Sequence, residues 1–169
     1  RFADEMDLHD LVTLVNAAYP QNPIEYPKVA NHLKSSPTHK WLILETSQKE
    51  GEDLIAACLL VFSVVDNLKV ASIEVLCVAD EYRRKGLASN LLQRAESISI
   101  ANGCKAGPSL KVLSNDEKTI KFLNFNKFAE FGGEMTSDGV FRLEFKSTQP
   151  VATKKNSEQP TVEKKIQPK

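Results

Sequence analysis

Residues 74–89 run from an apolar strand through three consecutive basic residues and a glycine into a helix, and this order constrains the fold more than any other stretch. The first backbone N–H groups of a helix have no partner within it, and together with the positive end of the helix dipole they attract an anion. Gly86 can adopt a positive φ, and Ala88 keeps the first helical turn thin. The segment therefore predicts a turn that binds a pyrophosphate. The alternative is a solvated charge run before an ordinary turn glycine.

The remaining hydrophobic pattern predicts an α+β domain with a mixed sheet. Apolar spacing indicates helices over 4–19, capped by Asp4, and over 27–34, 87–102 and 118–125. Runs of β-branched and aromatic residues indicate a strand stub at 1–3, strands over 41–46, 54–65, 70–78 and 110–114, and a closing hairpin of 128–134 with 140–145. A turn is expected over 66–69. We therefore expect a central mixed β-sheet of about six to seven strands with about four helices.

Composition argues for one folded domain over 1–146 followed by a tail. The chain has 169 residues, of which 41% are hydrophobic, and this is enough to bury a core. Its 22 basic and 22 acidic residues cancel, but residues 147–169 hold five lysines against two glutamates, which leaves 17 basic and 20 acidic residues before them. A slightly acidic domain lacks the positive surface that binds nucleic acid. The Lys- and Pro-rich tail has too few apolar residues to fold, so we expect it to be disordered.

The cysteines and the apolar runs bear on the compartment. Cys58, Cys77 and Cys104 are odd in number and lie in or beside apolar runs, so we interpret them as buried thiols rather than disulfides or metal ligands. The longest apolar run, 54–65, is too short to cross a bilayer. A cytoplasmic protein is therefore expected, with no metal and with no membrane or nucleic-acid partner. A monomer and a homodimer both remain open.

The hexapeptide Arg83-Arg84-Lys85-Gly86-Leu87-Ala88 resembles the acyl-CoA motif of the GNAT superfamily of N-acetyltransferases. That motif reads Arg or Gln, two residues, Gly, one residue, then Gly or Ala. Here it lies between an apolar strand and a long helix, and the segment Lys111-Val112-Leu113-Ser114-Asn115 and a further short helix follow. The resemblance also includes 14–19 in the first helix and does not reach the tail. It implies a three-layer fold, acetyl-CoA as co-substrate, and acetyl transfer to an amine by direct attack in a ternary complex.

The resemblance also assigns cofactor contacts. The strand that ends at Leu76-Cys77-Val78 is expected to carry a bulge that separates it from the next strand and frees backbone groups for the pantetheine arm. Asn115 is expected to contact the pantetheine or the adenine side, and Phe122 to lie close to the thioester. As alternatives, Asn115 caps the helix near Lys118, and Phe122 belongs to the core. The full set of expected cofactor contacts is Leu76, Cys77, Val78, Arg83, Arg84, Lys85, Gly86, Leu87, Ala88, Ser89, Asn115 and Phe122.

Attack of an amine on a thioester requires a base, and Glu74 is the candidate, acting directly or through water. In a regular strand Glu74 shares one face with Ser72, Leu76 and Val78, in an otherwise apolar run where a carboxylate is costly to bury. Relatives place a base or a water-holding residue on this face, four or six residues before the position of Val78. The alternative is that Glu74 pairs with a lysine or arginine across the sheet.

Many family members carry a tyrosine as general acid in the helix after Asn115, and here that position is Leu123. Leucine has no proton to give, so water or another residue must protonate the thiolate. The thiol of coenzyme A is a tolerable leaving group, and the positioning of the reactants supplies much of the acceleration. A non-catalytic acyl-CoA-binding module is therefore an alternative function.

The segment from Tyr19 to Tyr26, which includes Glu25, is expected to line the acceptor groove, because the family uses the matching segment in this way. A rim with these residues, Glu74 and Ser72 suits a small cationic amine, which we favour over a peptide. A protein N-terminal or lysine acetyltransferase that docks through the basic tail is the remaining alternative.

Overall fold

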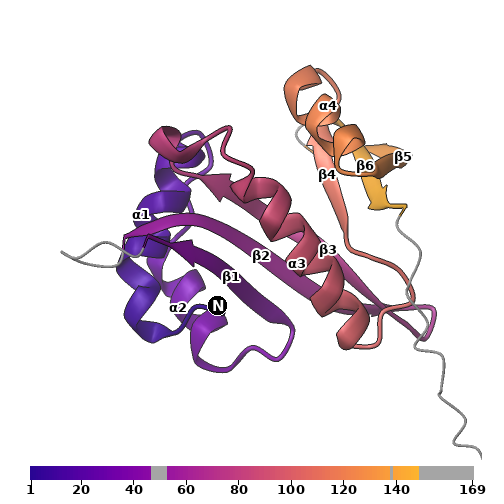
Figure 1. Cartoon of the computed structure of the whole chain (residues 1–169). Helices are drawn as coiled ribbons and strands as arrows, with labels where there is room; N and C mark the ends of the chain where they lie inside the picture. Colours follow the sequence, from indigo (N-terminus) through magenta and orange to yellow (C-terminus); the bar gives the residue numbers. More distant parts are fainter. Residues whose placement is uncertain (47–52, 138, 149–169) are drawn as a thin grey trace, which may run out of the picture.

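The computed structural model describes residues 1–46, 53–137 and 139–148, which build one six-stranded mixed sheet between helices (Figure 1). The strand order is β1-β2-β3-β4-β6-β5, with β3 and β4 parallel and all other neighbours antiparallel. The α+β class, the strand number and the four helices agree with the sequence-based expectation. The elements are η1 (Glu5–Asp7), α1 (Leu8–Ala18), α2 (Tyr26–Ser35), β1 (His39–Glu45), β2 (Leu54–Val65), β3 (Leu68–Val78), η2 (Asp80–Tyr82), α3 (Leu87–Ala101), β4 (Ser109–Leu113), α4 (Glu117–Phe125), β5 (Phe128–Met135) and β6 (Phe141–Ser147).

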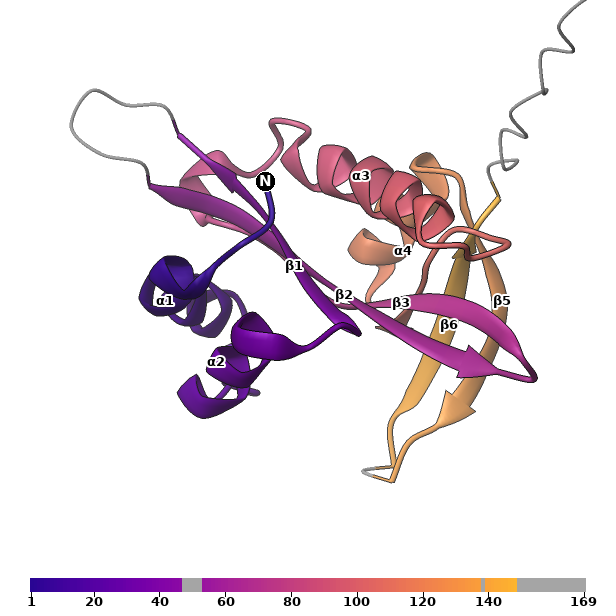
Figure 2. The same cartoon turned by 90° about the horizontal axis from the view of Figure 1, so that it is seen from below.

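Two apolar clusters separate the three layers. On one face, α1 and α2 bury Leu11, Val15 and Val29 against Trp41 and other residues of β1–β3. On the opposite face, α3 and α4 bury a second cluster; its members include Leu91, Leu92 and Leu123, together with Phe128 and Phe145. Figure 2 shows α1 and α2 on one side of the sheet and α3 on the other.

The N-terminal segment begins as the sequence predicts. Asp4 caps η1 by accepting a hydrogen bond from the Met6 backbone N–H at 2.8 Å, and the Asp7 carboxylate accepts one in return from the Asp4 backbone N–H. Phe2 forms an antiparallel bridge with Leu42, so the expected strand stub at 1–3 lies along the outer edge of β1.

The hairpin between β2 and β3 is tighter than the four-residue turn expected over 66–69. Asp66 and Asn67 both have positive φ, 50° and 61°, and β3 already begins at Leu68. Two such residues make the two-residue turn that matches the right-handed twist of a hairpin, and Asn and Asp tolerate this conformation. The two strands of the long hairpin β2–β3 therefore pair up to the turn, from Val65 opposite Leu68 onward (Figure 1).

The ends of the other elements differ from the expectation by one or two residues. Strand β4 begins and ends one residue earlier than predicted. Strand β6 extends through Ser147, the first residue of the predicted tail. The rest of the tail, 149–169, lies outside the described residues, so its expected disorder remains a prediction. In the part of the chain that the structure describes, no helix is long and apolar enough to span a membrane.

Candidate active site

The N-terminus of α3 has the form predicted for an anion site. Gly86 lies directly before the helix with φ 80° and ψ 2°, and no side chain caps this end. The first helical hydrogen bond runs from the Asn90 backbone N–H to the Gly86 carbonyl at 3.0 Å. The amides of the first turn therefore precede the regular ladder and are available to oxygen atoms of a phosphate.

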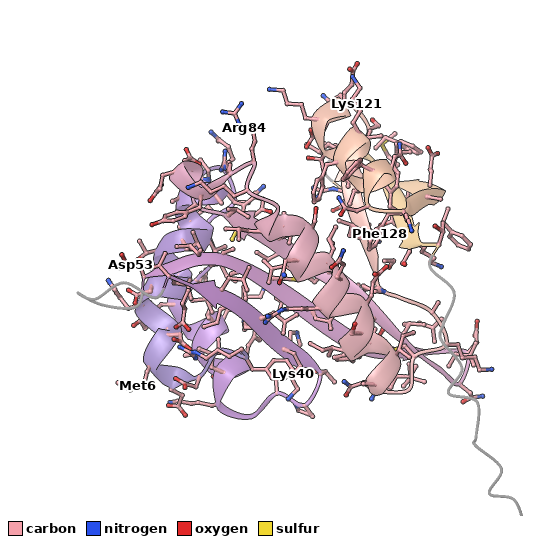
Figure 3. All side chains as sticks on the ribbon, in the orientation of Figure 1. Met6, Lys40, Asp53, Arg84, Lys121 and Phe128 are labelled. Atoms are coloured by element: carbon pink, nitrogen blue, oxygen red, sulfur yellow. The ribbon has the colours of Figure 1, made fainter. Side chains whose placement is uncertain are left out.

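The three basic residues before Gly86 are not equivalent. Arg83 forms an ion pair with Asp80 at 2.6 Å, and its Nε donates to the Val78 carbonyl at 3.2 Å. The ammonium group of Lys85 lies over the ring of Tyr82, 4.8 Å from its centre. Arg84 forms no ion pair within the described residues, and its side chain extends away from the ribbon (Figure 3). Its φ of 61° holds the turn in a left-handed conformation.

A β-bulge at Glu74 divides β3 into two halves. Leu59 pairs with Val75 and Leu60 pairs with Ile73, so Glu74 has no partner on β2. Pairing with β4 also ends here, because only Ser72 and Ile73 of β3 lie opposite β4 residues. Beyond the bulge the two strands diverge (Figure 1). The strand therefore has the expected bulge and separation, with the bulge two residues before Leu76.

The bulge corrects the predicted face of Glu74. Before it, Ile73 faces the α3 side; after it, Leu76 and Val78 face that side, while Val75 points to α1 and α2. The extra residue at Glu74 reverses the alternation, so Glu74 shares a face with Ser72 but not with Leu76 or Val78. Glu74 consequently lies on the face that carries α1 and α2.

Glu74 is exposed rather than set in a buried apolar run, which corrects our second expectation for it. Its Oε1 accepts a hydrogen bond from the Ser72 hydroxyl at 3.0 Å. Within the described residues it forms no ion pair, contrary to the alternative of a cross-sheet lysine or arginine partner. The ammonium group of Lys111 is bound to Glu134 instead, at 2.6 Å. That hydrogen bond raises the pKa of Lys111, and the carboxylates of Glu144 and Glu74 contribute to the rise.

The backbone of β3 beyond the bulge offers hydrogen-bonding groups to the gap. The Ala79 N–H donates to the Ile55 carbonyl of β2 at 2.9 Å. Because backbone groups alternate in direction along a strand, Ala79 and Cys77 direct theirs toward β2. Leu76 and Val78 therefore direct theirs toward the side that β4 has left. These are the groups that the sequence assigned to the pantetheine arm.

The β4–α4 turn decides the capping alternative for Asn115 and shows the surroundings of Phe122. Asp116, not Asn115, caps α4, since its carboxylate accepts from the Thr119 backbone N–H at 3.1 Å and from the Thr119 hydroxyl at 2.6 Å. Asn115 is exposed, and its side chain forms no hydrogen bond with the described residues. Phe122 is half-buried and packs against the core cluster of α3. Leu123, at the position of the family's general acid, is fully buried.

The acceptor-side residues come together at the end of α1. Tyr19 donates from its hydroxyl to the Leu76 carbonyl at 2.7 Å, and Glu25 and Tyr26 are exposed at the start of α2. Asn16 holds the connecting segment, because its side chain accepts from the Ile24 N–H at 2.7 Å and donates to the Ile24 carbonyl at 3.3 Å. Sequence reasoning missed Asn16; its only signal was a polar residue within an apolar helix pattern.

Cys77 is a poor candidate for a covalent acetyl-enzyme. The three cysteines are free and buried, as expected. Burial raises the pKa of the Cys77 thiol to about 12, so the nucleophilic thiolate is scarce near neutral pH.

Among the described residues no cluster of three or more His, Cys, Asp or Glu side chains can hold a metal ion. Two surface hollows, of about 360 and 440 Å³, lie beside β1, and the second also borders α3 from Asn90 to Ile98.

Comparisons with known proteins agree with this geometry. The sequence model of the acetyltransferase (GNAT) family matches residues 8–127. No curated protein matches the chain in sequence. Among solved structures, NAA60 from Arabidopsis thaliana in complex with acetyl-CoA is 14% identical, with a TM-score of 0.73 over 86% of this chain and 94% of that one. The ribosomal-protein-S18-alanine N-acetyltransferase from Escherichia coli is 18% identical, with a TM-score of 0.67 over 91% and 95%.

A third structure is a chimera of the spermidine N-acetyltransferase SpeG from Vibrio cholerae and hSSAT, 19% identical, with a TM-score of 0.69 over 87% of this chain and 93% of that one. At such identities these structures establish the common fold. The match to the family model covers well over half of the chain. The chain therefore belongs to the acetyltransferase (GNAT) family.

Proposed function

We propose that the protein transfers the acetyl group of acetyl-CoA to a small primary amine by direct attack in a ternary complex. The uncapped N-terminus of α3 carries this proposal, because it offers backbone N–H groups and the positive helix end to a diphosphate. Arg84 adds an exposed cation beside it. The separated edge of β3 at Leu76 and Val78 is assigned to the pantetheine arm, which then points its thioester toward the bulge at Glu74.

The remaining cofactor contacts are assigned by position. Asn115 and Phe122 lie in the β4–α4 region, beyond the gap from β3, where they can contact the arm from the opposite side. Arg83 is assigned an indirect part, since its guanidinium is already engaged with Asp80 and the Val78 carbonyl. It holds the loop in shape rather than neutralising phosphate.

Glu74 is proposed as the base that removes a proton from the attacking amine, directly or through water held with Ser72. It lies on the acceptor face, is accessible, and has its carboxylate oriented by the Ser72 hydroxyl. Direct attack is favoured over a covalent intermediate because the neighbouring thiol of Cys77 stays protonated near neutral pH.

A small cationic acceptor is favoured by the acidic groups on this face. Glu25 is exposed at the acceptor segment, and the carboxylates of Glu74, Glu134 and Glu144 lie close enough to act on Lys111. The structural relatives include enzymes named for a spermidine acceptor and for a ribosomal-protein alanine, so the acceptor must be measured. A cytoplasmic location remains a prediction from the cysteines.

Titration calorimetry with acetyl-CoA and a thiol-release screen over polyamines, arylalkylamines, amino acids, aminoglycosides and peptide amines test this proposal. We expect tight binding and acceptor-stimulated thiol release with a small amine. Release only with peptide amines would replace the small-amine acceptor by a peptide. If that activity needed residues 149–169, the tail would take part in docking. Tight binding without release from any acceptor would identify a non-catalytic acyl-CoA-binding module.

The Glu74→Gln variant tests the base. Turnover should fall on the order of 100-fold or more, with little change in the affinity for acetyl-CoA, because general base catalysis commonly contributes that much. Glu130→Gln is the matched control, since Glu130 is exposed on β5 opposite Phe145, on the α3 face. Turnover of Glu74→Gln equal to that of Glu130→Gln would reject the role of Glu74.

A further inference from the structure

Tyr19 connects the end of α1 to the part of β3 at which the reaction is proposed to occur. Helix α1 ends at Ala18, and the Tyr19 backbone N–H closes its last turn on the Val15 carbonyl at 2.9 Å. The side chain then crosses to β3, where its hydroxyl donates to the Leu76 carbonyl at 2.7 Å. The two residues are 57 positions apart, so only the folded sheet brings them together.

The Leu76 carbonyl is one of the groups that point into the gap between β3 and β4. A pantetheine arm that pairs with this edge approaches the same carbonyl oxygen, which has two lone pairs and can accept from the arm and from the Tyr19 hydroxyl together. The arm therefore passes next to this hydroxyl. In the proposed ternary complex the thioester sulfur, carried at the end of the arm, comes within reach of it.

The site has no other well-placed proton donor among the described residues. Leu123 occupies the position of the family's acid and is fully buried. The ring of Tyr82 is covered by Lys85 in the turn before Gly86, and Tyr26 is exposed at the start of α2. The thiol of Cys77 is buried against β2 and close to the Ala57 backbone. Tyr19 alone combines an ionisable hydroxyl with contact to the open edge.

The Tyr19 hydroxyl also keeps its proton under working conditions. Although 40% of the residue is exposed, its hydroxyl lies against β3, and burial there raises the pKa of Tyr19 above its usual 10. The phenol is therefore protonated throughout the neutral range, as a general acid must be before it donates.

We propose that Tyr19 is the proton donor to the departing thiol of coenzyme A, a role that rests on the proposed acetyl transfer. The amine nitrogen forms its bond to the acetyl carbon while Glu74 takes a proton from that nitrogen. The C–S bond breaks, its electron pair stays on sulfur, and sulfur takes the proton from the Tyr19 Oη. Glu74 gives up its proton to solvent, and the phenolate of Tyr19 recovers one from solvent, so both residues return to their starting states.

The test compares Tyr19→Phe with the parent enzyme and with Thr13→Val. Thr13 also lies on α1 and donates its hydroxyl, to the His9 carbonyl at 2.9 Å, but away from β3. We expect kcat to fall about 100-fold or more in Tyr19→Phe, with the KM for the amine little changed. Acetyl-CoA should bind about as tightly as before, because the Leu76 carbonyl stays available to the pantetheine arm. Thr13→Val should match the parent in all three.

A buffer acid provides a readout that a structural role would not change. If Tyr19→Phe lacks only a proton donor, its kcat should rise with the concentration of imidazolium, while kcat of the parent stays constant. A lower melting temperature with unchanged kcat would show that the hydroxyl only fastens α1 to β3. A raised KM for the amine with unchanged kcat would show that it only binds the acceptor.

The outcomes separate this inference from the proposed function. Turnover by the parent together with normal turnover by Tyr19→Phe overturns the donor role and leaves acetyl transfer intact. A parent that binds acetyl-CoA but releases no thiol with any acceptor overturns both, since no thiolate then forms for Tyr19 to protonate.

Discussion

Gly86 and Gly103 lie at opposite ends of α3 and make a matched pair for testing the anion site. Both have positive φ, 80° and 87°, and a Cβ built at either meets no atom within 4 Å. Replacing either with alanine therefore introduces the same backbone strain and no steric clash with the protein. Of the two, only Gly86 adjoins the uncapped amides of α3.

The structural cost of the two substitutions should be equal. An L-residue in the left-handed region costs roughly 1–2 kcal/mol, and a domain of this size loses about 2–4 °C in melting temperature per kcal/mol. Their effects on ligand binding should differ. Loss of one charge-assisted hydrogen bond to the diphosphate costs about 1.5–3 kcal/mol. Acetyl-CoA should therefore bind Gly86→Ala about tenfold more weakly than the parent, or more weakly still.

Thermal unfolding with and without coenzyme A measures both effects at once. At a ligand concentration about 100 times the dissociation constant of the parent, binding adds about 2.7 kcal/mol to the free energy of unfolding; for a tenfold weaker variant it adds about 1.4 kcal/mol. The ligand-induced rise in melting temperature should therefore be halved, or reduced further, in Gly86→Ala and retained in Gly103→Ala. Equal rises in the two variants would refute the placement of the diphosphate at this helix end.

Two further predictions concern charge. Arg84→Glu should weaken acetyl-CoA binding about tenfold at low salt and less at high salt, because an exposed cation acts through a screened field. Arg94→Glu, which makes the same charge change on the exposed side of α3, should bind normally in the same titration, and equal losses would point to net charge alone. Asp7 accepts hydrogen bonds from the guanidinium of Arg1 at 2.8 Å, and these lower the pKa of its carboxyl. The interaction of Asp7 with Arg1 therefore stabilises the folded state at pH values above the pKa of Asp in the unfolded chain, about 3.9. This stabilisation is lost as the pH falls from there through the lower pKa of Asp7 in the folded protein. Asp7→Asn should melt at a lower temperature than the parent at pH 7, and the difference should close at the acidic end; a constant difference would contradict the assignment.

Local patterns in the sequence were sufficient to predict most helices and strands and the turn at Gly86 before α3, which we call the cradle. The helices followed from apolar spacing, and the strands from β-branched runs, because burial on one face imposes a period on the chain. The cradle at Gly86 follows from the order of a strand, a glycine and a helix, and its positive φ was predicted for that reason. Caps and turns were less certain: Asp116 rather than Asn115 caps α4, because either residue type can cap a helix.

The face of Glu74 could not be predicted from alternation, because a bulge adds one residue and reverses the pattern beyond it. Nothing local marks this bulge; it depends on which residues of β2 oppose Ile73 and Val75. The exposure of Glu74 also depends on strand pairing, since β4 moves away where its pairing with β3 stops.

The sequence by itself determined the family, the helix end whose amides are available to an anion, and the presence of leucine rather than tyrosine at position 123, because each depends on residues close together along the chain. Only the tertiary structure decided which of the three basic residues has no ion pair or ring contact within the described residues, which face Glu74 occupies, and that Tyr19 reaches Leu76. Those relations join positions far apart in the chain, and the pairing of strands and the packing of α1 against the sheet fix them.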